Sequence, residues 1–233
     1  MSLHISGDPQ ADQLISREPL ALVIAMVLDQ QIPLEWAFKG PYELVDRLGA
    51  PLDAAALAAM DPEALVEAFS RRPALHRYPG SMAGRVQALC QVVVDDYRGD
   101  AARIWKTAAD GQELLSRVKK LPGFGDQKAR IFVALLGKQL GVTSSDWATA
   151  SSPFGEAGSY MSVADIVDAD SLTKVRQYKQ AMKAAKKAAA VTSTVPAKKA
   201  PAKKAAPAGR KTGAGKKAPS PKTAAKKTGA RTR

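Results

Sequence analysis

Apolar residues recur along most of the chain at the three- and four-residue spacing that is typical of amphipathic helices. The clearest stripe follows Pro19, a residue favoured in the first turn of a helix, and contains Leu20, Val23, Ile24, Val27 and Leu28. This stripe predicts a helix with one buried face. The same spacing predicts further helices over about 33–48, 53–59, 61–70, 82–98, 100–107, 110–120, 126–140 and 170–189. No stretch alternates between apolar and polar residues for long enough to predict a sheet, so we expect an all-α fold.

Proline and glycine interrupt the helical pattern at several places. Gly40-Pro41 and the segment 49–51 (GAP) are predicted to be stops between helices, and residues 73–80 (PALHRYPG) are predicted to form a turn-rich connector. Residues 121–125 (LPGFG) stand between two amphipathic helices. From 141 to 159 the pattern predicts no regular structure apart from a short helical turn at 146–150.

Charge divides the chain into two parts. The 233 residues contain 35 Lys and Arg against 22 Asp and Glu, and the excess lies at one end. From Val191 to Arg233 there are ten Lys, three Arg and no acidic residue, whereas residues 1–190 are neutral overall. Residues 191–233 consist mostly of Ala, Lys, Pro, Gly, Thr and Ser, which cannot bury enough apolar surface to offset the entropy of ordering. We therefore expect one helical domain over 1–190 and a disordered basic tail over 191–233.

The lysines of the tail occur largely in pairs between alanines and prolines, a pattern that resembles the tails of linker histones and of lysine-rich nucleoid proteins. The clearest pairs are Lys198-Lys199, Lys203-Lys204 and Lys216-Lys217. Such a segment is expected to bind DNA without sequence preference, by releasing counterions from the phosphates. The alternatives are a solubilising tail, or affinity for ribosomes or anionic lipid. A lipid anchor normally needs a second, apolar signal, so we favour nucleic acid.

Other compositional features exclude several classes of protein. A lone Cys90 excludes a disulfide framework and any cluster of thiolate metal ligands, including an iron–sulfur cluster. His4 and His76 lack metal-ligand spacing, and we expect no metal and no cofactor. The N-terminus does not have the pattern of a signal peptide, and the longest apolar run, 20–28, is about half the length that a bilayer requires. We expect a cytoplasmic monomer with no membrane partner.

The segment 121–125 is the strongest candidate for a binding function. It joins a helix that buries Leu114, Leu115 and Val118 to a second helix that buries Ala129, Phe132, Val133 and Leu136. Glycines at 123 and 125 allow a tight turn and a close approach of another molecule, with the free N–H groups of the second helix pointing outward. Such an arrangement suits a DNA phosphate. The alternative is a plain αα-hairpin whose glycines serve the turn alone.

The sequence LPGFG followed by DQKA closely resembles the helix-hairpin-helix element of the HhH-GPD superfamily of base-excision DNA glycosylases. Two earlier segments resemble the same superfamily in the expected order. Residues 19–37 (PLALVIAMVLDQQIPLEWA) are similar to the 3-methyladenine glycosylase branch in their apolar helix and glutamine pair. Residues 76–89 (HRYPGSMAGRVQAL) resemble the stretch that begins the helix preceding the hairpin. The resemblance covers roughly residues 15–150.

This resemblance implies a two-lobed helical body that binds double-stranded DNA containing a damaged base and rotates the target nucleotide into a cleft. A fixed carboxylate would stabilise the cationic sugar of the transition state. The family's carboxylate follows the second glycine by about 20–22 residues, which selects Asp146, 21 residues after Gly125. The local sequence departs from the family's usual pattern, and Ser145 or Asp146 could instead cap a short helix over 147–150. In that case Asp29 or Glu35 must approach the cleft, or there is no catalysis.

The family's bifunctional members carry a nucleophilic lysine two residues after the second glycine, where this chain has Gln127. The resemblance therefore implies a monofunctional glycosylase, with Gln127 at the DNA interface. Lys128 is predicted to contact phosphate or to be solvated. Gly123, Phe124 and Gly125 are predicted to contact DNA through the turn.

Four further residues are candidates for contacts with DNA or with the extruded base. Gln31 matches the position that fills the gap left by the base, and its alternative is a buried amide bonded to a loop. Gln30 and Trp147 are candidates for the base pocket, although Trp147 also suits the core. Arg77 is predicted to face a phosphate.

We therefore expect a nucleoid-associated, monofunctional DNA glycosylase of base-excision repair. The rival is a non-catalytic helix-hairpin-helix protein that binds DNA and has lost the chemistry. The feature that separates them is whether the Asp146 carboxylate faces an enclosed pocket. A nuclease or lyase is a weaker reading, because the sequence offers no evident carboxylate cluster for metal ions.

Overall fold

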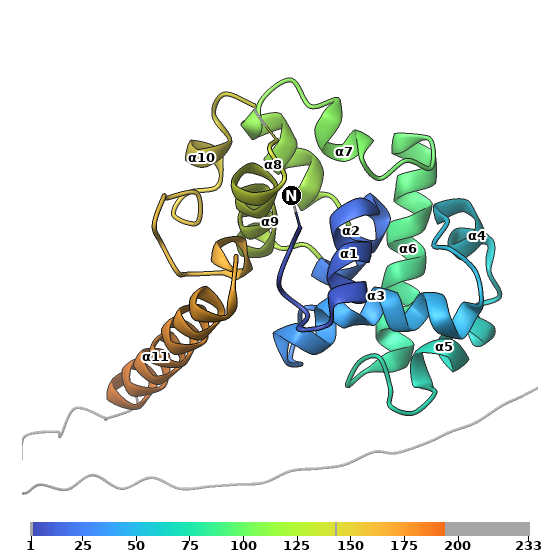
Figure 1. The fold of residues 1–233 in the computed structure, drawn as a ribbon, viewed down its shortest axis with the longest axis horizontal. Coiled ribbons are helices and arrows are strands. Elements are labelled where there is room, and N and C mark those ends of the chain that lie inside the picture. Colours follow the sequence, from blue (N-terminus) through green and yellow to red (C-terminus); the bar gives the residue numbers. More distant parts are fainter. Residues whose placement is uncertain (1, 143, 194–233) are drawn as a thin grey trace, which may run out of the picture. The chain divides into compact units, whose positions relative to one another are not determined.

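The computed structural model describes residues 2–142 and 144–193, with side chains as far as residue 185. The elements are α1 (Pro9–Arg17), α2 (Pro19–Leu28), α3 (Leu34–Leu48), α4 (Ala54–Ala59), α5 (Pro62–Ser70), α6 (Pro79–Tyr97), α7 (Arg103–Lys106), α8 (Gly111–Lys119), α9 (Asp126–Gln139), α10 (Trp147–Ala150), the 3-10 turn η1 (Val163–Asp165) and α11 (Ala169–Ser193) (Figure 1). No strand occurs over these residues. The predicted all-α class is confirmed.

Helix α2 forms the centre of the core. All nine residues from Leu20 to Leu28 are buried, so the prediction of a helix with one buried face was wrong. Helices α1, α3 and α6 all pack against α2. A helix that is apolar all round is stable only when neighbours surround it completely.

Helix α1 was not predicted, although the sequence carries a signal for it. Asp8 caps the helix by accepting hydrogen bonds from the backbone amides of Gln10 and Ala11, and Pro9 occupies its first turn. Its apolar stripe is short, with Ala11 and Ile15 buried. The cap was therefore the stronger indication of the helix.

The predicted stop at Gly40-Pro41 was also wrong, because α3 continues through both residues. Gly40 is buried against α2, where an added Cβ would lie 2.5 Å from Cδ1 of Leu28. Packing against the core thus accounts for the glycine. The predicted stop at 49–51 is confirmed, since Gly49 ends α3 with a φ of +64°.

Two groups of helices flank α2. Helices α4 and α5 pack against α6, while α8 packs against α9, and α10 contacts both of the latter. Their apolar faces belong to one continuous hydrophobic core. The division into two lobes stays a prediction.

The last helix, α11, contacts the core only near its beginning. Val175 is buried, whereas the side chains from Arg176 to Ala185 are exposed. The chain divides into a compact unit over Met1–Ser193 and a second unit over Thr194–Arg233, which lies outside the described residues. Among the helices described, none is both long enough and apolar enough to cross a lipid bilayer.

Candidate nucleic-acid interface

The turn between α8 and α9, residues 121–125, is held from within by its own backbone and by the core. The amide of Phe124 donates to the carbonyl of Leu121 at 3.1 Å. The Phe124 ring is buried and lies 5.7 Å from the ring of Phe132, measured between centroids. Its side chain therefore anchors the turn, and the contact of Phe124 with DNA through the backbone of the turn stays a prediction.

The two glycines of the turn serve different purposes. Gly123 has a φ of +89°, and an added Cβ would lie 2.8 Å from Cδ of Arg85. Both the backbone and the packing therefore require glycine at 123. Gly125 has a φ of −91° and would place a Cβ in open space. Neither the backbone conformation nor the packing requires glycine at this position. The absence of a side chain at Gly125 leaves the beginning of α9 accessible.

The first turn of α9 exposes backbone donors. No side chain caps this helix, and among the described residues no group accepts from the amides of Asp126, Gln127 or Lys128. The Asp126 carboxylate instead binds Lys119 at 2.7 Å and Arg130 at 2.9 Å. These two partners hold the pKa of Asp126 below its usual value. The helix dipole and three free N–H groups thus face outward together.

Lys128 points away from solvent, toward the end of α2. Its ammonium donates to the carbonyls of Met26 at 2.7 Å and Val27 at 3.3 Å, which are among the carbonyls that a helix end leaves unpaired. Burial lowers its pKa to about 8, although Asp29 nearby raises it. The expectation of a solvated side chain was wrong, and Lys128 ties α9 to α2.

Gln30 belongs to the same junction. Its amide nitrogen donates to the carbonyl of Val27 at 2.6 Å, and its amide oxygen accepts from Arg85 at 3.0 Å. The Gln30 carbonyl accepts from Nε2 of His76 at 2.7 Å, while Nδ1 of His76 accepts from the amide of Tyr78 at 3.0 Å. Both ends of the Gln30 amide are therefore engaged. Nothing in this geometry supports its predicted place in a base pocket.

We call Gln30, His76, Arg85 and Lys128 the α2-end cluster. It brings together the three segments that carry the family resemblance, because its members come from 19–37, 76–89 and the beginning of α9. Sequence reasoning did not single out Arg85, although it lies within the second of these segments. Its only signal was a basic residue near the beginning of a helix.

The other predicted DNA contacts at this end of the molecule are exposed. Gln31 has a φ of +56° and an exposed side chain, so the alternative of a buried amide was wrong. Gln127 is exposed in the first turn of α9. Arg77 is exposed, and its guanidinium carbon Cζ lies 5.4 Å from the centroid of the Tyr78 ring.

Asp146 lies at the other end of α8 from the turn. Its Oδ1 accepts from the backbone amide of Gly111, the first residue of α8, at 2.5 Å. Asp146 occupies the N-cap position of α10, but no side chain makes a capping bond there, so the alternative of a helix cap was wrong. An added Cβ on Gly111 would lie 2.7 Å from Cα of Trp147, which explains the glycine. The carboxylate therefore fastens the loop before α10 to the beginning of α8.

Trp147 packs on α9. An added Cβ on Gly137 would overlap its indole ring, so the missing side chain at 137 makes room for Trp147. The ring is half-buried against the core. This contact supports the core role of Trp147 that the sequence left open beside the base pocket.

Glu35 and Asp29, the carboxylates that the sequence offered as alternatives to Asp146, differ in their surroundings. Glu35 forms an ion pair with Arg176 of α11. Asp29 is half-buried at the end of α2, close enough to Lys128 to influence its pKa. Asp29 is therefore the carboxylate beside the α2-end cluster.

A groove of about 570 Å³ lies beside the turn, between α9 and α11. It is lined by Gln127, Ile131, Pro153, Phe154, Met161, Tyr178, Lys179, Met182 and Lys183. Gln127 connects it to the first turn of α9. The lining contains aromatic rings, an amide and two lysines, but no carboxylate. Asp146 is not part of it.

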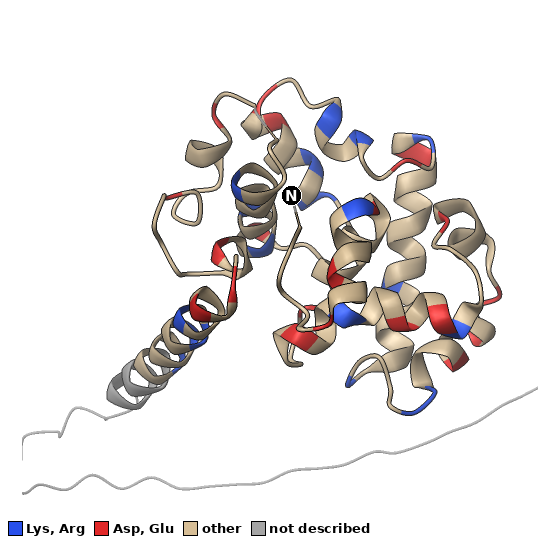
Figure 2. Cartoon of the chain, viewed as in Figure 1, with Lys and Arg blue, Asp and Glu red and all other residues tan. Residues whose placement is uncertain are grey.

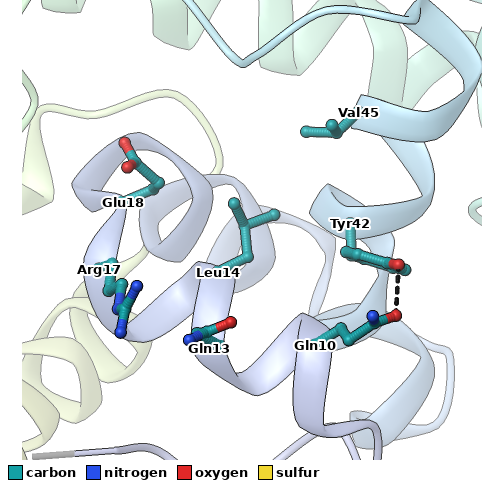
Figure 3. Close-up of a pocket in the computed structure, with 7 residues that line it drawn as sticks. All are labelled: Gln10, Gln13, Leu14, Arg17, Glu18, Tyr42 and Val45. Carbon is teal, nitrogen blue, oxygen red and sulfur yellow. Dashed lines mark hydrogen bonds between the residues drawn. The ribbon is translucent and has the colours of Figure 1, made fainter.

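A second hollow, of about 340 Å³, lies between α1 and α3 (Figure 3). It is lined by Gln10, Gln13, Leu14, Arg17, Glu18, Tyr42 and Val45, and the Tyr42 hydroxyl donates to Oε1 of Gln10 at 2.6 Å. None of the predicted site residues lines this hollow.

Basic and acidic residues are mixed over the described helices (Figure 2), in keeping with the neutral composition of residues 1–190. The concentrated positive charge lies in the tail, and the lysines predicted there to bind DNA fall outside the described residues. They are Lys198, Lys199, Lys203, Lys204, Lys216 and Lys217.

Comparison of the chain with protein-family models, with curated proteins and with solved structures gave no match.

Proposed function

We propose that this chain binds duplex DNA along its sugar-phosphate backbone through the turn at 121–125. The observation that carries the proposal is the uncapped first turn of α9, beside the open position Gly125, where three backbone amides find no acceptor in the described part of the chain. Backbone amides of this kind bind a phosphate strongly because the acceptor is charged. Such contacts fix the register on DNA and carry no sequence information.

The groove between α9 and α11 supports a more specific proposal, that an unpaired nucleotide enters beside the turn. Phe154 and Tyr178 offer aromatic surfaces on which a base can stack, and Lys179 and Lys183 offer charge for its phosphate. Gln127 can offer its amide to the edge of the base. An enzyme or sensor that examines a base has to take it out of the stack first.

Base excision by a monofunctional glycosylase is the proposed activity on such a nucleotide. A carboxylate fixed by the Gly111 amide supports it, because Oδ2 of Asp146 has no hydrogen-bond partner among the described residues. The groove lining favours the rival proposal, a DNA binder without chemistry, because it holds two lysines and no acid. A developing sugar cation would find no stabilising charge there.

Substitution of Gly125 tests the binding proposal. In Gly125→Asp, the new carboxylate can accept from the α9 amides itself, so it competes with phosphate while capping the helix. We expect duplex affinity to fall about tenfold or more in fluorescence anisotropy, with unchanged or slightly higher thermal stability. Gly125→Ala leaves the amides open and should bind within about twofold of wild type. Ala88→Asp, at an exposed position of α6, controls for the added charge. Unchanged affinity in Gly125→Asp would exclude this turn as the interface.

Base release from duplexes carrying alkylated, deaminated and oxidised bases tests the activity, with alkali cleavage reporting abasic sites. Wild type is compared with Asp146→Asn, Asp29→Asn and Glu35→Gln, and with Glu67→Gln, at an exposed position of α5, as the control. Loss of about a hundredfold in Asp146→Asn alone would support the glycosylase and its carboxylate. Binding without release of any of these bases would favour the non-catalytic protein.

A further inference from the structure

Arg85 is held beside the turn, and no acidic residue that the structure describes pairs with it. One Nη1 hydrogen points to Oε1 of Gln30 at 3.0 Å, and the side-chain stem rests against Gly123. Among the described residues, no carboxylate lies within 4.0 Å of the guanidinium and no second acceptor binds it. A guanidinium has five N–H donors in a rigid fork, so most of the Arg85 donors remain free.

Gln30 fixes the direction of that fork. Its own nitrogen is bound to the carbonyl of Val27, and its backbone carbonyl is bound by His76. The amide therefore cannot rotate without breaking a bond at the end of α2. A long side chain that is already fixed loses less conformational entropy when it binds a partner.

The charges around Arg85 favour an anion. Lys128 and Arg85 are close enough that each repels the other, and this repulsion adds to the burial that lowers the pKa of Lys128 to about 8. Asp29 offsets part of the charge, and His76 adds little because burial lowers the pKa of its ring and Nδ1 accepts from the Tyr78 amide. The α2-end cluster therefore retains a net positive charge beside the open amides of the turn.

We infer that Arg85 donates to the DNA phosphate bound at the turn, and that Gln30 is the residue that positions it. This inference rests on the proposed binding of DNA through 121–125 and names a side chain that completes that contact. A guanidinium fork matches the geometry of a phosphate, so it adds a charge-assisted contact to those of the backbone amides.

The salt dependence of binding by the full chain tests the role of Arg85. Each phosphate neutralised by a side chain contributes about −0.9 to the slope of log affinity against log salt. Arg85→Gln should therefore reduce the magnitude of the slope by about 0.9 and weaken binding about tenfold at low salt. Arg98→Gln removes an exposed charge at the other end of the same helix and should leave the slope unchanged. The tail is present in every variant, so its contribution to the slope is the same in each.

Gln30→Glu separates positioning from a merely structural role. The new carboxylate can still accept from Arg85, but it neutralises the guanidinium, so the slope should fall as it does in Arg85→Gln. A role of Gln30 in stability alone would change the thermal midpoint and leave the slope unchanged. An unchanged slope in Arg85→Gln, together with weak binding by Gly125→Asp, would overturn this inference while sparing the proposed interface. If both variants bind as wild type does, the proposed function fails as well.

Discussion

The carboxylate of Asp146 accepts a hydrogen bond from the backbone amide of Gly111 at 2.5 Å, across 35 residues of sequence. This bond satisfies one of the amides that the beginning of α8 cannot pair within the helix. Asp146→Ala should therefore lower the free energy of unfolding by about 1–2 kcal/mol. Asp146→Asn retains an oxygen acceptor and should cost less. Urea denaturation of the two variants measures the difference, and equal stability of Asp146→Ala and wild type would contradict the bond.

Replacing a glycine within a helix by alanine usually stabilises a protein, but the contact between Gly137 and Trp147 should reverse this effect. Gly137→Ala should destabilise the protein by about 1–3 kcal/mol, because its Cβ overlaps the indole ring. Gly84→Ala, in open space on α6, should instead stabilise by about 0.5–1 kcal/mol. Thermal denaturation gives both values. A stabilising Gly137→Ala would place Trp147 elsewhere.

His76 should make stability depend on pH in the acid range. Burial lowers the pKa of its imidazole below the ordinary 6.5, and protonation would break its bond from the Tyr78 amide. The stability that the neutral ring contributes is fully present above about pH 6.5 and is lost as the pH falls from there toward the folded-state pKa. The urea midpoint should fall between pH 7 and pH 5, and it should fall less in His76→Gln. Parallel decreases in the two proteins would show that His76 is not the group responsible.

Lys128 should titrate well below the other lysines. Its pKa is lowered to about 8 by burial, whereas an unperturbed lysine titrates near 10.5. Because the unfolded chain keeps its proton to a higher pH, stability should rise between about pH 8 and pH 10. Carbon-13 NMR of dimethylated lysines should show one resonance titrating near pH 8 that is absent in Lys128→Arg. A spectrum in which every lysine titrates near pH 10 would contradict the buried position.

The tail lysines should contribute to affinity without contributing to specificity. Replacing Lys198, Lys199, Lys203, Lys204, Lys216 and Lys217 by Gln should weaken binding and flatten the salt slope by up to about 0.9 for each lysine that contacts phosphate. The preference for a duplex with an unpaired base over an intact one should not change, because lysine–phosphate contacts carry no base information. A slope equal to that of wild type would exclude the tail from the complex.

Periodicity predicted the helices well where local pattern and packing agree. Helices α8 and α9 each bury an apolar stripe that the sequence displays, and their bounds lie within a residue or two of the prediction. The failures occurred where another signal outweighed the pattern. Helix α1 depends on its Asp8 cap more than on a long apolar run, and Gly40 stays helical because Leu28 packs against it.

The site was less predictable because its partners are largely backbone atoms. Gly125 is exposed at the beginning of α9, in keeping with the close approach of another molecule that the glycines of the turn predicted. The acceptors of Lys128, however, are carbonyls about a hundred residues away, and the donor to Asp146 is the amide of Gly111. Every residue except proline has both groups, so a sequence gives no sign of which will be used. Only the position of Lys128 beside the end of α2, and the packing of α10 against α8, select them.

Hydrogen–deuterium exchange of the full chain with and without duplex DNA tests the binding claim most directly. If the turn at 121–125 is the interface, DNA should slow exchange of the amides of Gly125, Asp126, Gln127 and Lys128, for which residues 2–142 and 144–193 provide no acceptor. The hollow between α1 and α3 should remain unaffected. Unchanged exchange over 121–128, in a complex that forms with full affinity, would contradict the claim and place DNA on another part of the chain.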